Sequence, residues 1–207
     1  MDTDRLEAFS DGVLAVAITL LVLDLHVPVP GRGSLANQLA GEWPSFAAYL
    51  VSFFVIGIIW VNHHGVLHNV ARVDRTAMFV NLLLLMFVTA IPFSTAIVAR
   101  YLHQGSRDAH LAAAIYGLPV LGVALSFTAL CAWAARRGLL HASVPGRGAA
   151  SSVRRFAAGS VAIAAAIGVA FVSAIAALAA HAAIAAYFCV ARSPRDADRS
   201  AASPSPR

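Results

Sequence analysis

The sequence predicts an all-α, polytopic membrane protein with six transmembrane helices and both termini in the cytoplasm. Of the 207 residues 59% are hydrophobic and only 12% are charged, whereas soluble domains carry about 25% charged residues. The apolar residues form runs long enough to cross a bilayer, and Pro, Gly and Arg separate these runs. All 15 basic residues are arginines beside the runs, so the net charge of +5 indicates membrane topology and no nucleic-acid partner.

Residues 1–191 are predicted to form one domain that contains all six spans. A Gly/Pro/Ser-rich loop follows the first span, and we expect a short surface helix between Gly31 and Glu42. The Ala-rich run near the end of the chain is too long for one span and just long enough for two. Residues 192–207 are rich in Pro, Ser, Arg and Asp, which predicts a disordered cytoplasmic tail. The predicted spans are about residues 6–27, 46–68, 76–99, 111–134, 156–171 and 174–190.

The distribution of arginine favours six spans over five. With six spans and a cytoplasmic N-terminus, only Arg32, Arg100 and Arg107 lie outside. Five spans would divide the arginines almost evenly, and the positive-inside rule would then give no orientation. The acidic N-terminus has no basic segment of a secretory signal, so we expect the first helix to be retained. Basic content made only of arginine is typical of a GC-rich bacterial genome, which predicts the plasma (inner) membrane.

Asp11 is the first candidate functional residue, because it places a carboxylate inside the first span. Asp11 and Asp24 enclose about 18 Å of apolar helix, which is shorter than the ~30 Å hydrocarbon core. Arg5 and Glu7 mark the cytoplasmic edge, so Asp11 lies roughly one and a half turns into the bilayer. An ionisable group at that depth is costly unless it faces protein or water. The sequence leaves open whether Asp11 braces helices or has a functional role.

The first span also carries an apolar stripe that faces away from this carboxylate. At about 100° per residue, Val16, Leu20 and Leu23 fall within about 60° of one another, with Thr19 at the edge. Asp11 lies roughly 120° or more from the centre of the stripe. Because the helix is apolar nearly all round, periodicity alone does not say whether the stripe faces lipid, core or a pore.

The second span ends in the stretch WVNHHGVLH, which supplies polar partners for the buried carboxylate. Trp60, His63 and His64, together with Asn81 near the start of the third span, can form hydrogen bonds at membrane depth. His64 and His68 also have the i,i+4 spacing that suits a metal or haem, but no matching pair lies in another span and HExxH is absent. We therefore predict an interhelical hydrogen-bond cluster, no metal site and no cofactor.

The first hundred residues resemble a known family. The signature RxxxFSD in its first helix is represented here by Arg5, Phe9, Ser10 and Asp11, followed by Gly-Val and ITLLVLDL. The resemblance continues through WVNHH at 60–64, NLLLL at 81–85 and IPFST at 91–95. These motifs resemble those of the prokaryotic relatives of lysosomal transmembrane protein 175, which are potassium channels. The later spans match only in hydropathy.

The resemblance implies a six-helix subunit that lacks the P-loop filter of ordinary potassium channels and assembles as a homotetramer around its first helices. By position it assigns Val16, Leu20 and Leu23 to hydrophobic pore-lining layers, and Thr19 to a hydroxyl beside the constriction. Relatives more often carry Ile or Leu in place of Val16, so we expect a wider layer there. The implied partners are the lipid bilayer, further copies of the chain and permeant potassium ions, with modest selectivity over sodium.

The resemblance further assigns a group of residues to a network that braces the first helix. The group consists of Arg5, Phe9, Ser10 and Asp11, with Trp60, His63 or His64, and Asn81 on its far side. Asp24 follows the pore-lining layers, and four copies would form a ring of carboxylates that attracts cations at the outer mouth.

Two other function classes remain open. A proton- or cation-coupled secondary transporter would also place Asp and His within the membrane, but such carriers usually show inverted repeats and broken helices, and this sequence shows no internal repeat. A membrane enzyme would need a nucleophile with a base, or a metal cluster, and the Asp11 and histidine set is weak evidence for either. We therefore expect no enzymatic activity.

Overall fold

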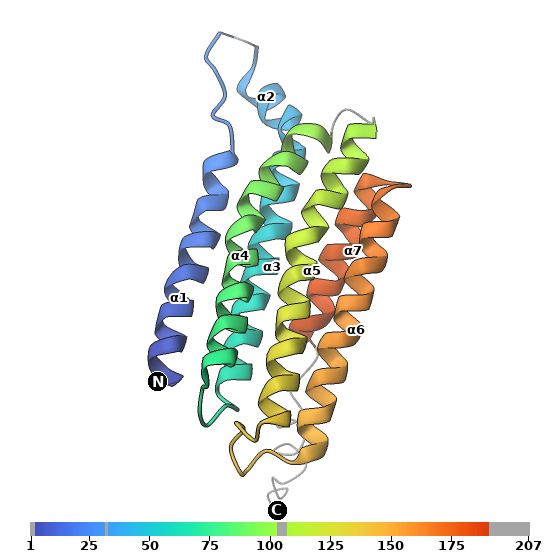
Figure 1. Cartoon of the computed structure of the whole chain (residues 1–207). Helices are drawn as coiled ribbons and strands as arrows, with labels where there is room; N and C mark the ends of the chain where they lie inside the picture. Colours follow the sequence, from blue (N-terminus) through green and yellow to red (C-terminus); the bar gives the residue numbers. More distant parts are fainter. Residues whose placement is uncertain (1–2, 32, 103–106, 191–207) are drawn as a thin grey trace, which may run out of the picture.

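The computed structural model describes residues 3–31, 33–102 and 107–190, and these residues form helices joined by short connections. The elements are α1 (Thr3–Leu20), the 3₁₀ helix η1 (Leu21–Asp24), α2 (Leu35–Gly41), α3 (Trp43–Leu67), α4 (Arg75–Tyr101), α5 (Arg107–Arg136), α6 (Gly146–Ala170) and α7 (Ala174–Val190). Figure 1 shows α1 and α3 to α7 side by side in one bundle, with α2 beyond one end. The predicted all-α fold is confirmed, and α2 is the predicted surface helix.

Five helices of the described chain are long and apolar enough to cross a membrane. They are α1 continued by η1, α3, α4, α5 and α6. α7 is also apolar but has 17 residues, or about 26 Å of helix, which is slightly less than the ~30 Å hydrocarbon core. The chain is therefore a multi-pass helical membrane protein in which the predicted sixth span is the shortest helix of the bundle.

Most helix boundaries lie within four residues of the predicted spans, and the start of α6 differs most. The predicted tail at 192–207 lies outside the described residues. The first helix ends at Asp24, where the backbone becomes extended at Leu25 ahead of Pro28 and Pro30. α6 begins at Gly146, ten residues before the predicted fifth span, because Pro145 starts the helix within the arginine-rich segment. Arg147, Arg154 and Arg155, which lie between the fourth and fifth predicted spans, are thus helical.

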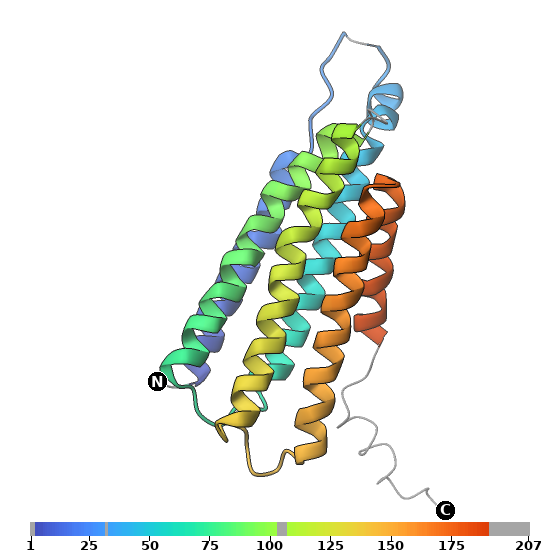
Figure 2. The same ribbon diagram turned by 45° about the vertical axis from the view of Figure 1, so that its right-hand side comes forward.

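α1 lies at one edge of the bundle. It packs against α3 and α4, while α6 and α7 lie on the other side of the bundle (Figures 1 and 2). The bundle centre is filled by apolar side chains from α3, α4 and α5, among them Ile56, Leu84, Val88, Ile91 and Tyr116. One face of α1 is therefore covered by protein and the opposite face is left open.

The end of the bundle that carries the start of α1 also carries the α3–α4 and α5–α6 connections (Figure 1). The two connections are joined by hydrogen bonds in which the Ala71 amide donates to the Leu139 carbonyl (2.8 Å) and the His141 amide donates to the Asn69 carbonyl (3.0 Å). The arginines near this end are Arg5, Arg72, Arg75, Arg136, Arg137 and Arg147. The structure thus collects most of the described basic residues at one end.

Asp74 fastens α4 to α5 at this arginine-rich end. Its Oδ1 accepts a hydrogen bond from the Ala77 backbone amide (2.8 Å), which caps α4, and both carboxylate oxygens accept from Trp133 Nε1 (3.0 and 3.1 Å). The Ala77 amide and the Trp133 indole hold the pKa of the Asp74 carboxyl below its ordinary value of 3.8.

Candidate functional site

The buried face of α1 and η1 is defined by five side chains spaced at i+3 or i+4. Four of them are apolar, and the fifth, Ser10, is fully buried. The set is Leu6, Ser10, Leu14, Ala17 and Leu21. The spacing makes a continuous stripe along a helix, so this face sets the rotation of α1 against α3 and α4.

Another face of the same helix is apolar but exposed in the single chain. Phe9, Val16, Leu20 and Leu23 have exposed fractions of 53%, 57%, 42% and 75%. We call these four residues the exposed stripe. Three of them are the predicted pore-lining residues, and the structure places all three on one open face. Large apolar side chains that gather on one helix face call for a cover, which is lipid or another protein copy.

Two polar residues lie beside the exposed stripe. Thr19 is exposed, and its hydroxyl donates to the Val16 carbonyl at 2.8 Å, so its oxygen lone pairs stay available on the open face. Asp24 ends η1 and lines a shallow depression together with Leu20, Leu23 and Arg100 of α4. Asp24, the predicted mouth carboxylate, therefore lies next to the exposed stripe.

A buried chain of hydrogen bonds ties α1 to α4 and α3. Asn81 lies at its centre: its Nδ2 donates to Ser10 Oγ (3.0 Å), and its Oδ1 accepts from His63 Nε2 (2.7 Å). The Ser10 hydroxyl donates in turn to the Leu6 carbonyl (2.8 Å). Ser10, His63 and Asn81 are each fully buried. We call Ser10, Asn81 and His63 the inner cluster.

The donor and acceptor roles in the inner cluster follow from chemistry. An amide oxygen can only accept, so His63 must carry its proton on Nε2 to bond Asn81. Its Nδ1 is then a bare acceptor, and among the described residues it has no hydrogen-bond partner. The imidazole packs edge-on to Phe127 of α5, with ring centroids 6.3 Å apart. The cluster thus fixes the separation and rotation of three helices.

A second, more exposed set of contacts joins α1 to α3. Trp60 Nε1 donates to Asp11 Oδ1 at 3.0 Å, and His64 Nδ1 lies 2.5 Å from Glu7 Oε1. Of the predicted partners, Trp60 meets Asp11, because the rotation of α3 turns Trp60 toward it. His63 bonds to Asn81 and His64 pairs with Glu7, so in the described part of the chain neither histidine makes the expected contact with Asp11. Among the described residues, no hydrogen bond or ion pair joins Arg5 to these contacts, and Phe9 belongs to the exposed stripe.

Sequence reasoning missed two contacts of this region. Glu7 was taken only as a marker of the membrane edge, although it pairs with His64. Arg155 of α6 donates through Nη2 to Asn62 Oδ1 of α3 at 3.2 Å, across 93 positions of sequence. The only sign of the Arg155 contact in the sequence was an arginine directly before an apolar run.

Among the described residues no group of three His, Cys, Asp or Glu side chains could hold a metal ion. His64 and His68, which have the spacing of a metal-binding pair, stack on each other.

Comparison with known proteins identifies relatives over the whole chain. The family described as "Endosomal/lysosomal potassium channel TMEM175" matches residues 5–92. A protein of Streptomyces collinus named as a potassium channel is 50% identical over 206 residues, which is 99% of each chain. A protein of Chamaesiphon minutus named as a potassium channel is 46% identical over 132 residues, or 62% of this chain and 64% of that one.

The fold also matches a solved structure. The crystal structure described as a lysosomal potassium-selective channel TMEM175 homolog from Chamaesiphon minutus superposes with a TM-score of 0.82 and 36% sequence identity. The match covers 91% of this chain and 96% of that chain. The similarity therefore extends beyond residues 5–92 to the helices that lack sequence motifs.

Proposed function

Because this chain belongs to the TMEM175 family, whose members are ion channels and not enzymes, we propose that it is a cation channel with a modest preference for potassium over sodium. The observation that carries the proposal is the exposed stripe of α1. An apolar helix face that the rest of its own subunit leaves open is what a pore-lining helix presents to its copies.

The proposed assembly is a homotetramer with α1 of each subunit at its axis. The exposed Thr19 hydroxyl and the Asp24 carboxylate both adjoin the exposed stripe. On a helix face that contacted only lipid, these polar groups would have no function. At a pore axis the hydroxyl meets ions and water, and the carboxylates form a ring that attracts cations. Replacement of Asp24 by Asn should then lower single-channel conductance at low salt, and unchanged conductance would count against the ring.

The proposed selectivity follows from the apolar layers. Four copies of Val16, Leu20 and Leu23 would form rings that exclude water, so an ion passes only when it sheds part of its hydration shell or when helix rotation widens the ring. Potassium gives up water more easily than sodium, so such a ring favours potassium without carbonyl ligands. The smaller Val16 makes the widest of the three layers. The discrimination between potassium and sodium is modest, because no fixed protein ligand replaces the water that the ion sheds.

The proposed topology has six crossings with both termini in the cytoplasm of a bacterial plasma membrane. It is supported by the gathering of arginines at the end of the bundle that carries the start of α1 (Figure 1). α7 makes the sixth crossing in this arrangement. Its modest length is compatible with local thinning of the bilayer, which costs a fraction of a kcal/mol per Å of mismatch.

The test is the reversal potential of the purified protein in a planar bilayer with potassium on one side and sodium on the other. Discrete current steps that reverse toward the potassium equilibrium potential support the proposal. Flux that saturates with ion concentration and shows no discrete steps would favour the proton- or cation-coupled transporter. Absence of current from folded protein across pH and voltage would contradict the channel.

A further inference from the structure

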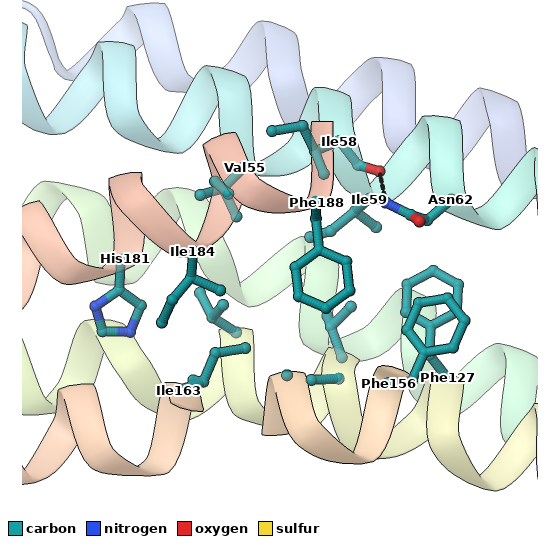
Figure 3. Close-up of a pocket in the computed structure, with 15 residues that line it drawn as sticks. Val55, Ile58, Ile59, Asn62, Phe127, Phe156, Ile163, His181, Ile184 and Phe188 are labelled. Carbon is teal, nitrogen blue, oxygen red and sulfur yellow. Dashed lines mark hydrogen bonds between the residues drawn. The ribbon is translucent and has the colours of Figure 1, made fainter. Parts of the chain in front are cut away.

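The seam between α5 and α6 has two sides with different surroundings. On the side that faces α3 and α7, apolar side chains close the seam around a narrow pocket, and Phe127 of α5 stacks on Phe156 of α6 with ring centroids 4.9 Å apart (Figure 3). Elsewhere along the seam lies an open groove of about 600 Å³. Every described residue that lines this groove belongs to α5 or α6, so the groove faces away from the other helices.

The groove combines an apolar floor with positive charge. Small side chains of both helices form the floor, namely Ala132 and Ala135 of α5 and Ala150 and Val153 of α6. The rest of the lining consists of arginines: Arg136, Arg147 and Arg154. We call these three residues the groove arginines. On each helix the lining residues are spaced at i+3 or i+4, which places them on one helix face.

The protein itself does not neutralise the groove arginines. All three are exposed, and no ion pair, side-chain hydrogen bond or ring contact within the described chain holds any of them. The adjacent Arg155, by contrast, lies over the ring of Phe156. The lining of the groove contains no carboxylate, and Asp74, which lines a neighbouring hollow, already accepts from Trp133. Three guanidinium groups beside one hollow therefore favour an anion, and their planar donors match the oxygens of a phosphate.

The groove lies at the depth of the lipid headgroups. α6 has 25 residues, or about 37 Å of helix, which exceeds the ~30 Å hydrocarbon core. Its charged residues are all among the first ten, so this end of α6 extends beyond the core. The α6 part of the groove covers 147–154 within that end, and Arg136 is the last residue of α5. Charge and apolar floor thus meet where a headgroup joins its acyl chains.

We propose that the groove binds an anionic phospholipid of the adjacent leaflet, with its phosphate at the groove arginines and one acyl chain along the alanine floor. The volume of the groove falls within the range of about 300–1,000 Å³ that is typical of ligand sites. Basic pockets between transmembrane helices are typical sites for anionic headgroups. A free anion would leave the apolar floor uncovered, and a zwitterionic lipid brings an ammonium group that arginines repel.

Native mass spectrometry of the full chain in a neutral detergent measures the affinity for three probes. The probes are phosphatidylglycerol, phosphatidylcholine with the same acyl chains, and glycerol phosphate, which has the anionic group without acyl chains. We expect phosphatidylglycerol to bind at least about tenfold more tightly than phosphatidylcholine, and glycerol phosphate to show no saturable binding over the same range. Equal affinities for the two lipids would overturn the proposal. Binding of glycerol phosphate as tight as that of phosphatidylglycerol would also overturn it, because the site would then hold a free anion.

A pair of double variants separates a defined site from the general positive charge of this end. Arg147→Gln with Arg154→Gln should reduce the preference for phosphatidylglycerol to less than about threefold. Arg72→Gln with Arg75→Gln removes the same charge from exposed positions that do not line the groove, and should change the affinity by less than about twofold. Equal losses in the two double variants would contradict a site in the groove.

A third variant tests the floor with all charges kept. Ala135→Leu with Ala150→Leu narrows the groove from both helices and should weaken the binding of phosphatidylglycerol at least about fivefold. Unchanged binding in this variant would show that no acyl chain lies on the floor. The groove is built by α5 and α6, and α6 lies across the bundle from α1 (Figure 2), so these measurements are independent of whether the chain conducts ions.

Discussion

The two halves of the bundle bury their polar side chains in different ways. In α1, α3 and α4, buried polar groups bond across helices, as in the inner cluster and in the 2.7 Å contact between Ser52 and Thr95. In α5, α6 and α7, Ser126, Ser160 and His181 each bond to a carbonyl four residues earlier in their own helix. Bonds across helices also reach the second half, where Thr128 Oγ1 lies 3.5 Å from Ser160 Oγ and Arg155 donates to Asn62. The first half is therefore fixed mainly by directional bonds between buried side chains, and the second half mainly by shape.

Glycines mark the places where shape matters in the second half. A Cβ on Gly159 of α6 would lie 2.6 Å from Phe188 of α7, and a Cβ on Gly122 of α5 would lie 2.5 Å from the ring of Phe87 of α4, where the two halves meet. Close packing of this kind tolerates many apolar sequences, whereas a hydrogen-bonded cluster requires particular residue types. This difference explains why the family match covers residues 5–92 while the fold match covers nearly the whole chain.

The largest effect is expected from Asn81→Ala, which removes the centre of the inner cluster. The change leaves the buried His63 donor and the Ser10 oxygen without their partner and opens a cavity, so the free energy of unfolding should fall by roughly 2–3 kcal/mol. The matched control is Ser126→Ala in the second half, which loses only a bond within its own helix and should cost less than about 1 kcal/mol. Thermal unfolding in detergent measures both, and equal losses would remove the distinction between the halves.

A smaller loss is expected from Gly122→Ala, because the Phe87 ring must shift to admit the methyl group. Overpacking of this kind should cost about 1–2 kcal/mol. Gly57 of α3 has nothing within 4 Å of an added Cβ, so Gly57→Ala should be neutral or slightly stabilising. If both variants unfold at the same temperature, close glycine contacts do not hold the second half.

Trp60→Phe removes the donor to Asp11 but keeps an aromatic ring. We expect a loss of about 1 kcal/mol, since the contact is partly exposed and water can replace the indole. In the same variant the inner cluster stays intact, so the amide of Asn81 should keep its protection in hydrogen exchange. A loss as large as that of Asn81→Ala would show that the two sets of contacts act as one.

The smallest effect concerns Asp74 and acid pH. Because folding lowers the pKa of this carboxyl, its contribution to stability is present above the ordinary value of 3.8 and is lost as the pH falls through the lower folded value. The unfolding temperature of Asp74→Asn should therefore be lower than that of the wild type at neutral pH, with a difference that shrinks as the pH falls below about 4. A difference that stays constant down to strongly acid pH would contradict this assignment.

The sequence was sufficient to predict the helical membrane fold, the family and the residue types of the first-half contacts. It did not predict which partners meet, because pairing depends on how far each helix rotates, and a helix that is apolar nearly all round gives no periodic signal. For this reason the sequence offered Trp60, two histidines and Asn81 as partners for Asp11, and only the structure shows that Trp60 meets it. The sequence did not single out His181 for a similar reason: α7 is Ala-rich on every side, and only the packing of the helices shows that the imidazole lies against Tyr116 of α5.

The central claim is that the exposed stripe of α1 lines a pore. In a Cys189→Ser background, cysteine can be placed at Leu23 of α1 or, as a control, at Val161 of α6, which is exposed to a similar extent in the single chain (75% and 70%). A water-soluble, charged thiol reagent should block the current of Leu23→Cys and leave that of Val161→Cys unchanged. Unaltered current through Leu23→Cys after exposure to the reagent would show that this face of α1 is covered by lipid and does not line the pore.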